Sequence, residues 1–215
     1  MKVTAESLAY WYLRLNGFLT IRNFIVHAEW RREGVGTDAD IVGARFPFRC
    51  EMVRRPLVDD EGFCTDDRRL SLVIAEVKTG QCALNGPWTN PDRQNVQKVL
   101  AAIGVYSPEK LEDVSAGLYA SGTYEDDNCA ASLVAFGSKE NAALREQYPA
   151  VRQVLWRQVK AFIHQRFANY LMEKAWHQTW EPDGQHLYEL AGLEQNSERF
   201  CDLVEVVPER GTGEP

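Results

Sequence analysis

Apolar residues in the first part of the chain follow a helical spacing and then an alternating one. Four large side chains recur at intervals of three and four residues: Leu8, Trp11, Tyr12 and Leu15. This spacing predicts an amphipathic helix over residues 6–16, and the Asn-Gly pair at its end is a common helix stop. Two β-rich segments follow, at residues 19–27 and 37–45, and we expect each to form a strand.

The middle of the chain holds the strongest strand signal. Residues 46–69 interrupt the pattern with prolines, paired arginines and a cluster of acids, so we interpret them as a long insertion between strands. The segment 70–79 (LSLVIAEVKT) is rich in β-branched and aliphatic residues and predicts a strand. Asn90 then offers a helix N-cap directly before a proline, which predicts a helix that runs to about Ile103.

Shorter patterns predict the remaining elements. We expect strands over residues 114–120 and 131–136, and a long helix with an apolar stripe over residues 149–176. The order is helix, strand, strand, strand, helix, strand, with an extra strand and helix after it. Strands interleaved with helices predict an α/β fold in which helices flank one central mixed sheet.

The net charge of -7 would argue against a nucleic-acid partner, but the charge is unevenly distributed. Residues 181–215 hold nine acidic and two basic residues, whereas the first 180 residues hold 22 of each. We therefore divide the chain into a folded domain, residues 1–180, and an acidic C-terminal tail, residues 181–215, with a short helix and an edge strand. One hypothesis is that this tail shields a basic surface from nucleic acid.

Composition narrows the setting of the protein. Hydrophobic residues make up 45% and charged residues 26%, which is typical of a globular domain. No uncharged apolar run approaches the roughly 20 residues that cross a bilayer, so we expect no membrane partner. The five cysteines form no C-x-x-C pair, which disfavours a structural zinc site and predicts reduced thiols in a cytoplasmic protein.

Candidate chemistry lies at the end of the strongest predicted strand. In a strand, residues two apart share a face, so Glu76 and Lys78 project in the same direction. An E-x-K triplet also arises by chance, but an acid on a second strand strengthens the signal. Asp40 begins the apolar part of strand 37–45, and neighbouring strands would bring it close to Glu76. Asp38 is an alternative that we place second, because it lies nearer the glycine-rich loop.

This combination favours a metal-dependent hydrolase. Carboxylate oxygens are the ligands that Mg²⁺ or Mn²⁺ prefers, and a neighbouring ammonium group stabilises developing negative charge. Together they suit the hydrolysis of phosphodiester bonds.

The pattern resembles the PD-(D/E)xK superfamily of restriction-endonuclease-like nucleases over about residues 5–136. The superfamily has an α-β-β-β-α-β core, an Asp on the second strand and a (D/E)-x-K on the third, which here are Asp40, Glu76 and Lys78. The first helix is similar to the opening of Holliday-junction resolvases and Mrr-like endonucleases at five positions: Glu6, Ala9, Leu13, Gly17 and Phe18. Gln94 resembles the glutamine of the helix that follows the third strand.

The resemblance implies a Mg²⁺- or Mn²⁺-dependent nuclease that acts on DNA more readily than on RNA. It implies that Asp40, Glu76 and Glu6 are metal ligands, with Lys78 and Gln94 as further catalytic residues. Glu6 is equally well explained as an exposed helix acid, and Gln94 as a solvated helix position. A role in anti-phage defence or restriction, with a second copy or a protein partner that activates the enzyme, fits by analogy. The alternative is a non-catalytic regulatory or assembly subunit on the same fold.

Overall fold

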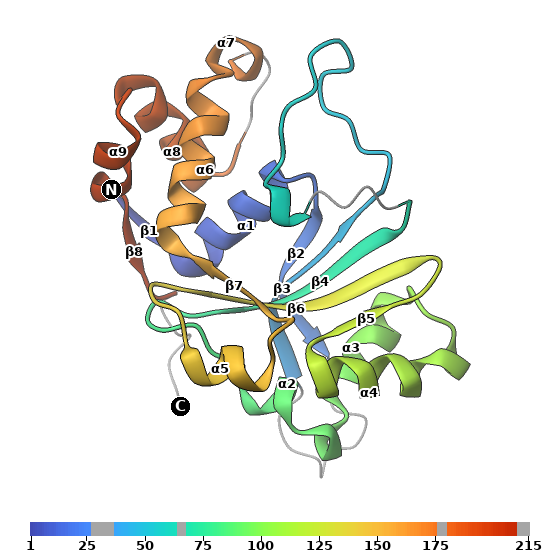
Figure 1. Ribbon diagram of the computed structural model, residues 1–215. Helices are drawn as coiled ribbons and strands as arrows, with labels where there is room; N and C mark the ends of the chain where they lie inside the picture. The colour runs from blue at the N-terminus through green and yellow to red at the C-terminus, as the bar shows by residue number, and fades with distance from the viewer. Residues whose placement is uncertain (27–36, 64–67, 176–179, 210–215) are drawn as a thin grey trace.

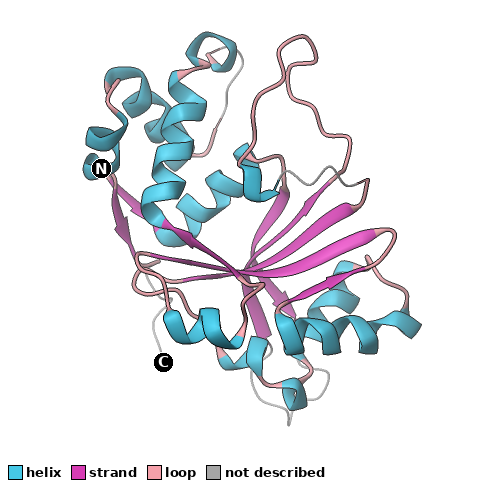
Figure 2. Cartoon of the chain, viewed as in Figure 1, coloured by secondary structure: helices cyan, strands magenta, loops and turns pink. Residues whose placement is uncertain are grey.

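The computed structural model describes residues 1–26, 37–63, 68–175 and 180–209, and it shows a mixed α/β fold (Figure 1). Within these residues the central sheet has six strands in the order β2–β3–β4–β6–β5, and β7 also pairs with β6. The strands are β2 Leu19–Val26, β3 Thr37–Arg45, β4 Leu70–Val77, β5 Thr123–Glu125, β6 Cys129–Gly137 and β7 Arg152–Leu155. Helices lie on both faces of this sheet (Figure 2).

The sheet is mixed, as predicted. β2, β3 and β4 form an antiparallel meander, whereas β4 and β6 pair in parallel, and so do β6 and β7. Four of the predicted strands are confirmed with small shifts of their ends: β2, β3, β4 and β6. The predicted end of the first strand at His27 lies outside the described residues.

One face of the sheet is covered by the first helix and the C-terminal helices (Figure 1). These are α1 Ala5–Leu15, α6 Trp156–Ala168, α8 Pro182–Leu193 and α9 Ser197–Leu203, with the short α7 Leu171–Lys174 between them. The predicted first helix is confirmed: the Thr4 side chain caps its start by accepting from the Ser7 N–H, and Gly17 follows its end with a φ of 84°. Burial of its apolar stripe against α6 and the sheet forms one core.

The other face of the sheet carries the helices that lie between β4 and β7 in the sequence. They are α2 Gly86–Thr89, α3 Asn95–Ile103, α4 Leu111–Ser121 and α5 Ala142–Gln147, with 3-10 turns η2 Pro91–Arg93 and η3 Pro108–Lys110. Their apolar side chains pack on the sheet in a second core. The Asn90 side chain accepts from the Asp92 N–H, as a cap does, but it caps η2, because Gln94 adopts a left-handed backbone and delays the α-helix to Asn95.

The predicted strand over residues 114–120 is wrong, because this segment lies inside α4. Its β-branched and aromatic residues favour a strand locally. However, the buried residues Leu111, Val114, Ser115 and Leu118 recur at helical spacing and face the second core. Gly122, with a φ of 81°, then ends the helix and allows β5 to turn back onto β6.

The predicted long helix over residues 149–176 is also partly wrong. It begins with β7, because Val154 is buried against the sheet and pairs with Phe136 of β6. The helix α6 starts at Trp156 and ends at Ala168. The predicted end at Trp176 lies outside the described residues.

Residues 181–207 pack into the fold, although we predicted an acidic tail from residue 181. Leu187 and Ala191 of α8 and Phe200 of α9 are fully buried in the first core. The strand β8 Glu205–Val207 then pairs in parallel with β1 Lys2–Thr4 at the start of the chain. The acidic residues of this segment are exposed or half-buried, and its apolar side chains supply the buried positions, so an acidic sequence still contributes to the core.

The insertion over residues 46–69 is held on the first face by buried charges. Asp59 accepts from Arg45 of β3 at 2.9 Å and from Arg166 of α6 at 2.9 Å. Glu51 receives the Lys174 ammonium at 2.8 Å. The long insertion is thus anchored to both the sheet and α6, and it includes the 3-10 turn η1 Glu61–Phe63.

Two expectations from composition can be compared with the described residues. Among the helices there, none is both long and apolar enough to span a bilayer. Four of the five cysteines are described, and each is a free thiol: Cys50, Cys82, Cys129 and Cys201. Cys64 lies outside the described residues.

Candidate active site

Asp40 lies where β3 leaves regular pairing on both of its edges. Towards β4 the last pair is Ile41 with Ala75, so the next position, Asp40 beside Glu76, is already beyond the ladder. Towards β2 the pairing passes over Asp40 and its neighbour Asn23, which has a φ of 50°. Pairing breaks of this kind redirect side chains and are common beside active sites.

The Asp40 carboxylate replaces the missing backbone partner. Its Oδ2 accepts a hydrogen bond from the backbone N–H of Val77 at 2.6 Å. A buried N–H without an acceptor is costly, so this contact stabilises the opening between β3 and β4 and fixes the Asp40 side chain there.

Glu76 is buried to 3% exposure and both of its oxygens are engaged. Oε1 forms an ion pair with the Lys78 ammonium, and Oε2 accepts from Trp88 Nε1 at 2.5 Å. Trp156 Nε1 donates to the Lys78 carbonyl at 3.1 Å, which holds the end of the E-x-K segment from the other face of the sheet. The ion pair between Glu76 and Lys78 confirms the prediction that the two side chains project in the same direction.

Glu6 approaches the same place from the first turn of α1. Burial raises the pKa of its carboxyl group, the neighbouring Glu209 carboxylate raises it further, and the Lys78 ammonium lowers it. Its Oε2 is buried and has no hydrogen-bond partner within the described part of the chain. The strand pairing explains the approach of Glu209: β8 runs parallel to β1, with Val207 opposite Thr4, so two residues further Glu209 lies beside Glu6.

The charges of these side chains act on one another. Burial raises the pKa of Asp40 to about 7, and the Glu76 carboxylate contributes to the rise. The Val77 N–H and the Lys78 ammonium oppose it, and Glu6 adds to it. Three carboxylates therefore share one ammonium in a partly buried space, so the cluster carries an excess of negative charge when all three ionise.

A divalent cation suits the donor set of this cluster. It offers hard carboxylate oxygens, one of them buried and unpartnered on Glu6, and a cation would offset the repulsion that raises the pKa of Asp40. In their present contacts Asp40 Oδ2 and both oxygens of Glu76 are bound by protein donors, which a cation would have to displace or share. Among residues 1–26, 37–63, 68–175 and 180–209, no group of three His, Cys, Asp or Glu side chains forms a ready ligand set.

Two other sequence candidates lie apart from the cluster. Asp38 is exposed near the start of β3, which agrees with the preference for Asp40. Gln94 is exposed at the turn before α3, with a left-handed backbone. Its side chain makes no hydrogen bond to Asp40, Glu76 or Lys78 in the part of the chain that the structure describes. The structure therefore groups Glu6, Asp40, Glu76 and Lys78 and does not bring Gln94 into contact with them.

Sequence reasoning missed the two tryptophans that hold the E-x-K segment. Trp88 follows a proline in a loop-like stretch, and Trp156 begins a helix, so neither shows a catalytic pattern. The available signal was a buried-type strand that ends in a carboxylate, because such a group needs donors from elsewhere in the chain. That requirement predicts that donors exist but does not identify them.

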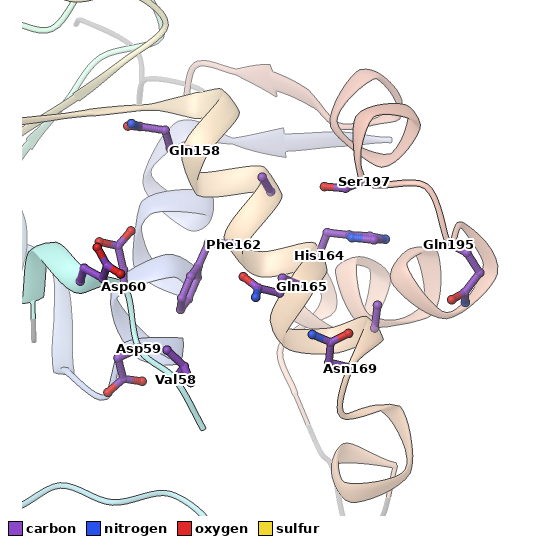
Figure 3. Close-up of a pocket in the computed structure, with 13 residues that line it drawn as sticks. Val58, Asp59, Asp60, Gln158, Phe162, His164, Gln165, Asn169, Gln195 and Ser197 are labelled. Atoms are coloured by element: carbon purple, nitrogen blue, oxygen red, sulfur yellow. The ribbon is translucent and has the colours of Figure 1, made fainter. Parts of the chain in front are cut away.

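A cavity of about 780 Å³ elsewhere in the molecule is a weaker candidate. It is lined by the insertion, α6 and the turn between α8 and α9. Figure 3 shows Phe162 on the side of α6 that faces Asp59 and Asp60, whereas His164 points toward the side of Gln195. The helix thus divides the space, and the lining consists mainly of amides and acids.

Two acids of this cavity, Asp59 and Asp60, are already paired with arginines. Burial alone would raise the pKa of Asp59, but hydrogen bonds from Arg49, Arg166 and Arg45 hold it below its ordinary value. Asp60 is bound by the Arg152 guanidinium, and its pKa is lowered as well. Carboxylates of this kind stay ionised and paired, which suits structural ion pairs better than acid–base chemistry.

The cluster at the opening between β3 and β4 is therefore the site that the geometry supports best. It combines buried carboxylates, an ammonium group and a perturbed pKa at one end of the sheet. Comparison with known proteins adds no relative, because no family model, curated protein or solved structure matches this chain.

Proposed function

We propose that this protein is a metal-dependent nuclease that hydrolyses phosphodiester bonds, with DNA as the preferred substrate. The observation that carries the proposal is the convergence of Asp40, Glu76, Lys78 and Glu6 where β3 and β4 separate. These residues come from three elements that are distant in sequence, so a chance E-x-K triplet does not explain their meeting.

The order of elements supports the same proposal. α1, β2, β3, β4, α3 and β6 follow the α-β-β-β-α-β order, with the short α2 inserted before α3 and with α4 and β5 inserted before β6. The acid-bearing strand β3 pairs antiparallel with the E-x-K strand β4, and β4 pairs in parallel with β6. The order of elements, the acid on the second strand and the E-x-K on the third are the features of the resemblance that support the proposal.

Each residue of the cluster has a distinct role in the proposal. Asp40 and Glu76 would hold Mg²⁺ or Mn²⁺, with Glu6 completing the carboxylate set. A bound cation would polarise the phosphodiester and make a bound water more acidic. Lys78, which is partly exposed, orients the attacking water and offsets the negative charge that develops on the phosphate.

Cleavage assays with matched variants test the proposal. Supercoiled plasmid and single-stranded DNA are incubated with the protein and Mg²⁺ or Mn²⁺, and product is quantified over time. Glu76→Gln and Lys78→Met should each reduce the rate by about 100-fold or more. Asp38→Asn is the control, because it removes an exposed acid from the same strand as Asp40 and should retain wild-type activity.

The outcome separates the two function classes. Equal cleavage by wild type and Glu76→Gln would show that the activity does not come from this cluster. A folded wild type that neither binds Mn²⁺ nor cleaves nucleic acid would instead favour a regulatory or assembly subunit on the same fold.

A further inference from the structure

Glu76 has two side-chain partners, Lys78 and Trp88, and they differ in burial. The Trp88 indole Nε1 donates to Glu76 Oε2 at 2.5 Å, and the side chain is only 1% exposed. Lys78, which holds Oε1, has a side chain that is 32% exposed on a flexible stem. Of the two partners, Lys78 is therefore the one that can move, while Trp88 is fixed.

The element that carries Trp88 is itself held in place. The backbone N–H of Trp88 donates to the Asn85 carbonyl at 2.9 Å, at the start of the short α2. The Tyr119 hydroxyl of α4 donates to the Pro87 carbonyl at 3.3 Å and accepts from the Val96 N–H of α3 at 3.1 Å. α2 is thus tied to two longer helices, so the indole is presented to Glu76 from a rigid support.

We propose that Trp88 is a positioning residue of the active site, whose indole N–H fixes the orientation of the Glu76 carboxylate and leaves Oε1 as its exchangeable oxygen. This inference rests on the proposed function, since it assigns Trp88 a role towards the same cation. Groups that orient a ligand in this way affect metal affinity by about 10- to 100-fold when they are removed. Trp88 does not contact substrate in this assignment and acts only through Glu76.

Trp11 offers a matched control for the loss of an indole. Both tryptophans are 1% exposed, but Trp11 Nε1 has no hydrogen-bond partner among the residues that the structure describes, whereas Trp88 Nε1 donates to Glu76. Replacing either by Phe removes a similar volume from a packed core, and the loss in stability should be comparable. Only Trp88→Phe removes a hydrogen bond from the site.

The first measurement is Mn²⁺ binding by isothermal titration calorimetry on folded full-length protein. Trp88→Phe should weaken the affinity by about 10-fold or more, whereas Trp11→Phe should leave it within about 2-fold of wild type. In a Glu76→Gln background, Trp88→Phe should have no further effect, because the residue acts through Glu76. Equal Mn²⁺ affinity of wild type and Trp88→Phe would overturn the inference.

The second measurement needs no metal and separates the two possible failures. In a ¹H–¹⁵N spectrum the Trp88 indole resonance is identified by its loss in Trp88→Phe, and it should move in Glu76→Gln while the Trp11 resonance stays. If wild type binds no Mn²⁺ but the Trp88 resonance moves, the proposed function fails and the orienting hydrogen bond stands. A Trp88 indole resonance that keeps its position in Glu76→Gln would reject the positioning role, whether or not the protein binds metal.

Discussion

The Asp40 carboxylate accepts a hydrogen bond from the backbone N–H of Val77, with 2.6 Å between Oδ2 and N. This contact replaces a rung of the ladder at the first position after β3 and β4 stop pairing. One side chain therefore both opens the sheet and supplies a carboxylate to the cluster. Any change in the charge of Asp40 acts directly on the backbone that precedes Lys78.

The stability of the metal-free protein should depend on the protonation of Asp40. The folded state raises the pKa of Asp40 to about 7, chiefly by burial, so the protonated form is favoured. The stabilisation is present at low pH and is lost as the pH rises through about 7. Asp40→Asn should be more stable than wild type by about 1–2 kcal/mol at pH 8, after allowance for solvent screening. The difference should be clearly smaller at pH 5 and should vanish only below about pH 4, where Asp40 is protonated in the unfolded chain as well.

Urea unfolding in EDTA at both pH values measures this difference. Asp38→Asn is the control, because Asp38 is exposed and should show no comparable change with pH. A wild type whose stability relative to Asp40→Asn stays constant from pH 5 to 8 would contradict the raised pKa.

Metal binding should show the opposite dependence on pH. A cation requires an ionised Asp40, so protons compete with Mn²⁺ at and below a pH of about 7. We expect the Mn²⁺ affinity to rise by up to about 10-fold per pH unit between pH 5 and 7 and to level off above that. Calorimetric titrations in matched buffers measure this, and an affinity that is constant over the range would remove Asp40 from the ligand set.

The buried arginine cluster around Asp59 should be essential for the stability of the fold. Its carboxylate pairs with Arg45 and Arg166, whose side chains are 9% and 2% exposed. Asp59→Asn leaves the buried Arg45 without its counter-charge and leaves Arg166 with only the more distant Glu51 carboxylate at 3.5 Å, which should cost about 3–5 kcal/mol. Because the pKa of Asp59 is lowered in the fold, its contribution is present above the ordinary carboxyl range and is lost on acidification.

Chemical denaturation at pH 7 tests the size of this effect. Glu61→Gln is a suitable comparison, since it removes an exposed acid from the same insertion and should change the stability by less than about 0.5 kcal/mol. A similarly small effect of Asp59→Asn would show that the insertion is not anchored by this carboxylate.

Two glycines of α8 should respond differently to alanine. A Cβ on Gly184 would lie 1.8 Å from Cζ2 of Trp11, so the helix approaches α1 through its bare backbone. Gly184→Ala should therefore lower the stability by about 1–3 kcal/mol or more. A Cβ on Gly192 would come no closer than 3.4 Å to the Leu171 side chain, so Gly192→Ala should be neutral or slightly stabilising. Thermal melts of the two variants measure the contrast, and equal melting temperatures would refute it.

Local patterns in the sequence were sufficient for much of the central sheet. Strands β2, β3, β4 and β6 were predicted because each combines β-branched residues with clear ends. The approach of Asp40 to Glu76 followed from the rule that sequential strands are neighbours, and the antiparallel pairing of β3 and β4 confirms that premise. These predictions depend on residues that are close in sequence.

The missed features depend on contacts between distant segments. Residues 111–121 are helical because Leu118 and Val114 face the second core, and this packing outweighs the local strand propensity of Val114 and Tyr119. Trp88 reaches Glu76 only once α2 is docked on α3 and α4. A short helix was expected in the C-terminal segment and is present as α8, but α9 and the packing of both helices into the core escaped prediction, because acidic residues outnumber the few well-placed apolar ones such as Leu187 and Phe200.

The pairing of β1 with β8 has a consequence for the order in which the protein folds. Lys2 lies opposite Glu205, so the strand that leads into α1 and Glu6 is completed by a segment that is very distant in sequence. Contacts of such long range form late, because the entropy of closing the loop between them must be overcome first. A partly folded chain with a finished central sheet would therefore still lack the complete carboxylate cluster, which requires Glu6 to be in place.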